Sequence, residues 1–144
     1  MTPNFDKYAQ KSNLFLKEVA NELHIPEDRG KALRILRAVL HGLRDRIPPQ
    51  ESLQLIAQLP MFIKAIYVES WKWSPNNKGL RHLDDFMMSV KKHDGVSGPN
   101  DFENPEQTEK NIKAVFRVLK RHVSEGEIAD VVATLPSSLR PLFV

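Results

Sequence analysis

The chain has 144 residues, of which 41% are hydrophobic, 27% charged and 8% aromatic. This composition fits one ordinary soluble domain with a single core, and it argues against a long disordered tail or a multidomain enzyme. Lys and Arg number 21 against 18 Asp and Glu, so the formal charge of +3 is too small by itself to imply a nucleic-acid or membrane partner. There is no cysteine, which excludes disulfides, thiolate metal sites and cysteine nucleophiles and makes the cytoplasm the expected location.

The first residues lack the basic and apolar regions of a secretory signal. The longest apolar stretch, Leu53–Val68, contains Pro60 and Lys64 and is shorter than the roughly 20 apolar residues that a spanning helix needs. We therefore expect neither a signal peptide nor a transmembrane segment.

Apolar residues recur at helical spacing nearly everywhere along the chain, and alternating strand-like runs are missing, which predicts an all-α protein. A first helix is expected from Phe5 to about Leu23, because Pro26 disfavours helix in the residue before it. The second should run from about Asp28 to Arg46. A short helix to about Gln58 follows Pro48-Pro49, and another should end near Trp71. The apolar stripe of the second helix consists of Leu36, Val39, Leu40, Leu43 and Ile47.

The second half begins after a segment of turn residues at 74–79. A helix is expected over Leu83–His93, followed by a loop from Asp94 to Asn100. A long helix over Pro105–His122 and a shorter one over Ser124–Ala133 come next, and Pro136 opens a terminal turn or two. Ser124 and Glu127 have the spacing of a capping box, in which each side chain accepts a hydrogen bond from a free backbone N–H.

The chain also contains an internal repeat. A shift of 76 positions aligns Lys31–Val68 with Gln107–Val144 without a gap, and eight of the 38 positions are identical, where typical residue frequencies give about two or three. A weaker match at a shift of 71 extends the repeat backwards. We predict a compact helical bundle of about seven or eight helices, built from two tandem repeats (about 13–68 and 84–144) with pseudo-twofold symmetry. Residues 1–144 then form a single helical domain, with repeat one at about 1–73, a linker at about 74–81 and repeat two at about 82–144.

Several segments carry a family resemblance. The stretch Ala32–Arg46, followed by Ala57–Met61 and by Tyr67 and Trp71, resembles the bacterial family catalogued as domain of unknown function 2267. The second-half stretch Ala114–Ile128, followed by Leu135-Pro136, resembles it too. The resemblance leads us to expect Gly where this chain has Ser70. It implies an all-helical bacterial domain and supplies no catalytic residues.

Charge is segregated along the chain. The stretches 29–46 and 110–121 hold 11 of the 21 basic side chains and one of the 18 acidic ones, so the remainder has a net charge of −7. Four positions repeat at i, i+3, i+7 and i+10, which places each set on one helix face. Such faces suit an acidic partner, a nucleic-acid backbone or a phosphate-bearing ligand, or they are solvated surfaces paired with acids elsewhere in the domain. The two sets are Arg34, Arg37, His41 and Arg44, and Lys110, Lys113, Arg117 and Lys120.

The aromatic cluster at the end of the first repeat consists of Tyr67, Trp71 and Trp73. Tyr67 and Trp71 are expected to form a lid over the core between the repeats. Trp73 is the candidate for an exposed contact with a partner or ligand, because Trp combines a large area with a polar handle.

Motifs for catalysis, metal binding and cofactor binding are missing from the sequence. The five His lack the i, i+4 spacing of a helical zinc site, and His82, Asp84 and Asp85 read as a helix start. We expect a non-catalytic cytoplasmic interaction module whose basic faces and Trp73 corner meet a protein partner, and no nucleic-acid partner. The alternative is a binder of a small acidic or phosphorylated ligand between the repeats. A cavity lined by Arg or Lys would favour this alternative, whereas a dry contact with an exposed apolar patch would favour the protein partner.

Overall fold

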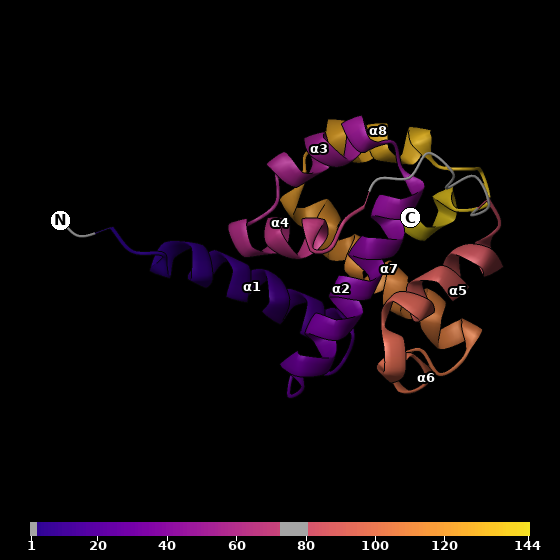
Figure 1. Ribbon diagram of the computed structural model, residues 1–144, viewed down its shortest axis with the longest axis horizontal. Helices are drawn as coiled ribbons and strands as arrows, with labels where there is room; N and C mark the ends of the chain where they lie inside the picture. The colour runs from indigo at the N-terminus through magenta and orange to yellow at the C-terminus, as the bar shows by residue number, and fades with distance from the viewer. Residues whose placement is uncertain (1–2, 73–80) are drawn as a thin grey trace.

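The computed structural model describes residues 3–72 and 81–144, and in these ranges the chain is helical with no strand (Figure 1). The all-α prediction is therefore confirmed. The predicted turn at 74–79 lies outside the described residues. The elements are α1 (Asp6–Glu22), α2 (Arg29–Arg46), α3 (Pro49–Ala57), α4 (Met61–Val68), α5 (Leu83–His93), the 3-10 helix η2 (Gly95–Ser97), α6 (Gly98–Asp101), α7 (Pro105–His122), α8 (Glu125–Thr134) and the 3-10 helix η3 (Arg140–Phe143).

The two 18-residue helices α2 and α7 start and end in the same way. The Asp28 carboxylate accepts the N–H of Lys31 at 3.0 Å, and the Asn104 amide oxygen accepts the N–H of Gln107 at 2.8 Å. Each side chain thereby satisfies one of the free N–H groups of a helix start. Both helices end at an extended residue that precedes the next short helix. The bounds of α7 are those of α2 shifted by 76 residues.

The core forms where α2 and α7 pass each other at the centre of the molecule (Figure 1). The predicted apolar stripe of α2 is buried, each of its five members being at most 3% exposed. The corresponding stripe of α7 is buried as well. Its members are Ile112, Val115, Phe116, Leu119 and Val123.

Helices from the two halves of the chain are interleaved. The first helix, α1, packs on α7 as well as on α2 and α4, whereas α5 packs most extensively on α2. The short helices α3 and α8 pack against each other (Figure 1). The N-terminal part of α1 extends beyond the rest of the bundle (Figure 1). Each half therefore buries its apolar surface partly against the other half, and the predicted twofold repeat stays a prediction that the matching helix bounds favour.

Two predicted boundaries differ from the structure. The segment Asp94–Asn100, expected to be a loop, contains η2 and the start of α6, because Pro99 sits where a helix start tolerates a missing N–H. Helix α4 ends at Val68 instead of near Trp71, because Ser70 adopts a left-handed backbone with φ of 54°. Glycine adopts this conformation most easily, and Ser70 is the position where the family resemblance led us to expect one.

The predicted capping box at the start of α8 is only half formed. The Ser124 hydroxyl accepts the N–H of Glu127 at 3.2 Å, as expected. The N–H of Ser124, however, donates to Gln58 Oε1 at 2.7 Å. The expectation that the Glu127 carboxylate caps the helix is therefore wrong, because Gln58 at the end of α3 occupies the donor.

Among the described residues, no helix is both long and apolar enough to cross a lipid bilayer.

Candidate anion-binding groove

The link between α1 and α2 forms one wall of the candidate site. Helix α1 ends at Glu22, and His24 then turns the chain with a left-handed φ of 60°. Pro26 prevents the helix from continuing, and Asp28 caps α2. This path brings Leu23 and Ile25 beside the N-terminal part of α2.

The first part of α7 forms the facing wall. Gln107 Nε2 donates to Asn111 Oδ1 at 2.8 Å, and Asn111 Nδ2 donates to the backbone oxygen of Asp101 at 2.8 Å. The i, i+4 spacing of the two amide side chains places both on one face of the helix. Asn111 is buried, and its hydrogen bond to Asp101 holds the end of α6 against α7.

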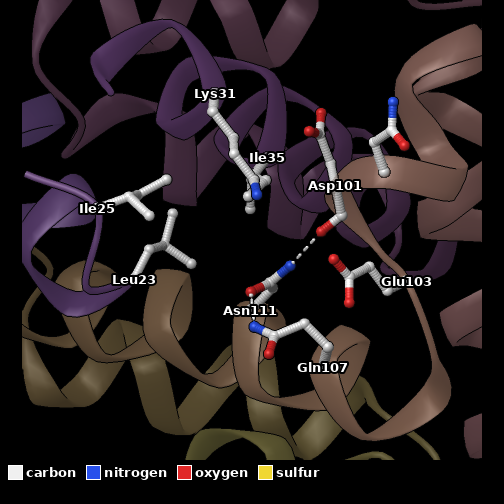
Figure 2. A pocket seen from close by; sticks show the side chains of 9 residues that line it. Leu23, Ile25, Lys31, Ile35, Asp101, Glu103, Gln107 and Asn111 are labelled. Carbon is white, nitrogen blue, oxygen red and sulfur yellow. Dashed lines mark hydrogen bonds between the residues drawn. The ribbon is translucent and has the colours of Figure 1, made fainter. Parts of the chain in front are cut away.

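A cavity of about 220 Å³ lies between these walls, and we name it the polar cavity. Figure 2 shows Lys31 and Ile35 reaching in from α2, Leu23 and Ile25 on one side, and Gln107 and Asn111 below. Apolar side chains thus line one side, and the polar remainder combines amides with Lys31 and the two acids Asp101 and Glu103. The full lining is Leu23, Ile25, Lys31, Ile35, Asn100, Asp101, Glu103, Gln107 and Asn111.

A second cavity of about 440 Å³ adjoins the first, and we name it the basic groove. It shares Leu23, Gln107 and Asn111 with the polar cavity and continues along α7. Its other lining residues are Glu22, His24, Lys110, Lys113 and Arg117. Three of the eight basic-face residues that the sequence singles out therefore line one concave surface.

Glu22 is the acid of the basic groove, and its charge is already engaged. Its carboxylate accepts a hydrogen bond from Arg117 Nε at 3.1 Å and another from Arg121. The hydrogen bond from Arg121, assisted by Arg117, outweighs the effect of burial and holds the pKa of Glu22 below its ordinary value. The carboxylate thus stays ionised and fixes Arg117 in place.

Among the described residues, the two groove lysines form ion pairs only with acids of their own helix. Lys110 Nζ lies 3.3 Å from Glu106, and Lys113 Nζ lies 3.6 Å from Glu109, both at i, i+4 spacing. Such exposed pairs contribute only about 0.3–0.5 kcal/mol. Both lysines can therefore turn to an incoming anion at little cost.

Lys120, the fourth basic residue of the α7 set, lies outside the groove. Its Nζ donates to the backbone oxygen of Phe143 at 3.0 Å, at the C-terminal end of the chain. Arg44 of α2 makes the equivalent contact 76 residues earlier, because its Nη1 donates to the backbone oxygens of Tyr67 and Glu69 at 2.8 and 2.7 Å. The two cations bind carbonyl groups at a helix end, where the helix dipole is negative.

The α2 set is not an exposed face, contrary to the expectation. His41 and Arg44 are only 7% and 6% exposed, because α4 packs over this part of α2. Burial lowers the pKa of His41, and its Nε2–H donates to the Ile66 carbonyl at 2.7 Å. The expectation that these two residues face solvent is therefore wrong.

Arg34 and Arg37 of the same set pair with acids inside the molecule. Arg34 forms two hydrogen bonds with Asp101, from Nε at 2.8 Å and from Nη2 at 3.1 Å. Arg37 Nε lies 3.3 Å from Glu69 Oε1. Neither residue lines the groove. Trp73 lies outside the described residues.

The sequence reasoning missed Lys31, Gln107 and Asn111. The amide pair carried a usable signal, because Gln107 and Asn111 follow a helix start at i, i+4 spacing on the face that continues to Lys110 and Arg117. No sequence signal marks Lys31, because its proximity to α7 depends on how two helices that are far apart in the sequence pack together.

Comparison with known proteins gives one assignment. A search of curated proteins finds no match. The family model described as "Uncharacterized conserved protein (DUF2267)" matches residues 12–142, so this chain belongs to that family.

Proposed function

We propose that the protein binds a small acidic or phosphorylated ligand in the basic groove, without catalysing a reaction. The observation that carries this proposal is the position of Lys110, Lys113 and Arg117 along one concave surface of α7. Against these three cations, the described lining offers one carboxylate, Glu22, which Arg117 and Arg121 already bind. The groove therefore presents net positive charge to a ligand.

The dimensions and chemistry of the two cavities suit a small molecule. Ligand sites are concave, occupy roughly 300–1,000 Å³ and combine apolar walls with a few placed polar groups. The basic groove has a volume of about 440 Å³, and the adjoining polar cavity adds Gln107 and Asn111 beside Leu23 and Ile25. With its anionic group bound by the lysines, the rest of the ligand would lie in the polar cavity.

The cytoplasm is the location that we propose for this binding. The chain has no cysteine, which suits a reducing compartment, and the family resemblance points to a bacterial protein.

The test is a titration of ¹⁵N-labelled protein with inorganic pyrophosphate, followed by NMR. We expect the amide signals of 23–25 and 107–117 to shift in a saturable manner. The double variant Lys110→Gln/Lys113→Gln should weaken this binding at least tenfold, because each lost charge-assisted contact costs about 1 kcal/mol or more.

The matched control is Lys7→Gln/Lys11→Gln, which removes the same charge from the exposed N-terminal part of α1. It should bind pyrophosphate like the wild type. Equal weakening in both double variants would show that only the net charge matters, and the proposal would then be abandoned. Absence of any saturable shift with pyrophosphate, phosphate or citrate would contradict it as well.

A second candidate is the protein-interaction module expected from the sequence, and a different surface favours it. Phe5, just before α1, and Tyr8 in its first turn are 73% and 41% exposed, and their rings stack with centroids 6.3 Å apart. Adjoining exposed apolar side chains are typical of contact surfaces. Recovery of the same partner from lysate by wild type and by Lys110→Gln/Lys113→Gln, but not by Phe5→Ser/Tyr8→Ser, would favour this candidate over the ligand.

A further inference from the structure

The contact between α3 and α8 brings together polar side chains from equivalent positions of the two halves. Glu51 and Glu127 lie in the first turns of their helices and are 76 residues apart. Gln54 and Asp130 follow each of them at i+3. This spacing places both members of each pair on one face of their helix, and the two faces meet where α3 packs on α8.

The three carboxylates converge on a small volume. One oxygen each from Glu51, Glu127 and Asp130 lies within 4.8 Å of the other two. Oxygen atoms bound to a single Ca²⁺ at about 2.3–2.6 Å lie within roughly twice that distance of each other. The separation of these oxygens therefore suits a shared cation.

Gln54 adds a fourth polar group to this cluster. One of the two terminal atoms of its side-chain amide lies 3.3 Å from Glu51 Oε2 and 3.2 Å from Glu127 Oε1. With the amide nitrogen at this position, Gln54 donates a hydrogen bond to each carboxylate. After rotation of the amide by 180°, its oxygen would stand there instead and could serve as a further ligand of a cation.

One carboxylate oxygen of Glu127 lacks a partner, although the other lies within reach of Gln54. The Glu127 side chain is only 6% exposed, and Oε2 has no hydrogen-bond partner among the residues that the structure describes. The N–H that it was expected to cap donates to Gln58 instead. Within the same described ranges, no Lys, Arg or His forms an ion pair with the three acids. A buried carboxylate oxygen without a partner is costly, and a bound cation would remove this cost.

We infer that Glu51, Glu127 and Asp130 bind a divalent cation at the contact between α3 and α8. The donor set consists of oxygen atoms, which is the preference of hard cations such as Ca²⁺ and Mg²⁺. Glu127 supplies the buried ligand, whereas Asp130 is exposed and leaves the site open to solvent. The sequence did not reveal this site, because its ligands come from two helices far apart along the chain.

The bound cation links the two halves of the molecule. Helix α3 belongs to the first half and α8 to the second, and their first turns share the ligands. Cation binding should therefore raise the stability of the folded protein, since a ligand that binds only the folded state stabilises it.

The test measures thermal unfolding of chelator-treated protein in 0–5 mM CaCl₂ or MgCl₂, with NaCl at matched ionic strength as the reference. We expect a saturable rise of Tm with at least one of the two cations. Glu127→Gln and Asp130→Asn should each weaken the apparent affinity at least tenfold. Glu125→Gln removes an exposed acid from the same helix turn and should respond like the wild type.

A second measurement does not depend on the variants. Mn²⁺ added to the ¹⁵N-labelled wild type should broaden the amide signals of 50–55 and 124–131 before those of α5 and α6. Equal broadening across all acidic surfaces would overturn the proposal. It would also be overturned if Tm responded to CaCl₂ and MgCl₂ no more than to NaCl, or if Glu127→Gln kept the full response.

Discussion

Basic side chains have three different roles in this fold: they bind carbonyl groups, form internal ion pairs or line the groove. Arg44 is 6% exposed and binds the carbonyl groups at the end of α4. Arg34 is paired with Asp101, whereas Lys110 pairs with the exposed Glu106 of its own helix. Helical spacing correctly places residues on a common face, but it does not say which other helix covers that face. The sequence therefore identified the cations and could not separate the buried ones from the ones that line the groove.

Asp94 illustrates an acid whose charge opposes folding. Its Oδ2 is buried without a partner among the described residues. Burial, followed by the contact with the Asp101 carboxyl, raises the pKa of Asp94 to about 7. Burial also acts on Asp101, but hydrogen bonds from Arg34 and Asp94 hold the pKa of Asp101 below its ordinary value. A proton on Asp94 would let it donate to an ionised Asp101.

This arrangement predicts a specific pH dependence. The folded state binds the Asp94 proton more tightly than the unfolded state, so this residue lowers the free energy of unfolding as the pH rises from about 4 to 7. Asp94→Asn removes the effect. Its gain in stability over wild type should be larger at pH 8 than at pH 5 by about 1–2 kcal/mol, measured by urea unfolding.

Asp101→Asn is the contrasting variant for this prediction. It should lose stability at both pH values, because Arg34 loses the partner of its two hydrogen bonds. An equal gain for Asp94→Asn at pH 5 and pH 8 would show that the Asp94 proton does not bind more tightly in the folded state.

At the scale of elements, close packing of α2 on α5 depends on one glycine. A Cβ atom at Gly42 would lie 2.6 Å from Val90 Cγ2, whereas one at Gly126 in α8 would meet nothing within 4 Å. Gly42→Ala should therefore cost about 1–3 kcal/mol through overpacking. Gly126→Ala should gain roughly 0.5 kcal/mol through helix propensity. Urea unfolding of both variants checks this prediction, and equal effects of the two substitutions would contradict it.

The helices were predictable where the apolar stripe and the cap residues agree. The bounds of α2 and α7 match the prediction to within a residue, because a stripe, a capping residue and a following stop coincide. Helix α6 was missed because Gly98-Pro99-Asn100 carries both turn chemistry and helix-start chemistry. For the candidate groove, the α7 wall was predictable and the facing wall was not, since packing between Leu23–Lys31 and α7 is a tertiary property.

At the scale of the whole molecule, the interleaved halves should unfold together. Leu36 in α2 and Ile112 in α7 are fully buried in one core cluster. Replacing either by Ala should cost about 2–5 kcal/mol. Both tryptophans of the chain lie in the first half, so Trp fluorescence reports on that half. Far-UV circular dichroism reports on all helices.

We expect the fluorescence and dichroism transitions to coincide in the wild type and in both variants, as they do in two-state unfolding. Ile112→Ala should shift both transitions equally. A shift of the dichroism transition alone, with the Trp transition unchanged, would show instead that the halves unfold independently.

The packing of α1 on α7 also has a consequence for synthesis of the chain. During translation, α1 leaves the ribosome first, whereas Pro105–His122 emerges about a hundred residues later. At roughly 5–20 residues per second, the part of α1 that packs on α7 waits on the order of five to twenty seconds for that helix, although α2 and α4 emerge earlier. The face of α1 that packs on α7 thus stays uncovered during most of the elongation of the chain, so the core of the bundle is completed only after α7 has emerged.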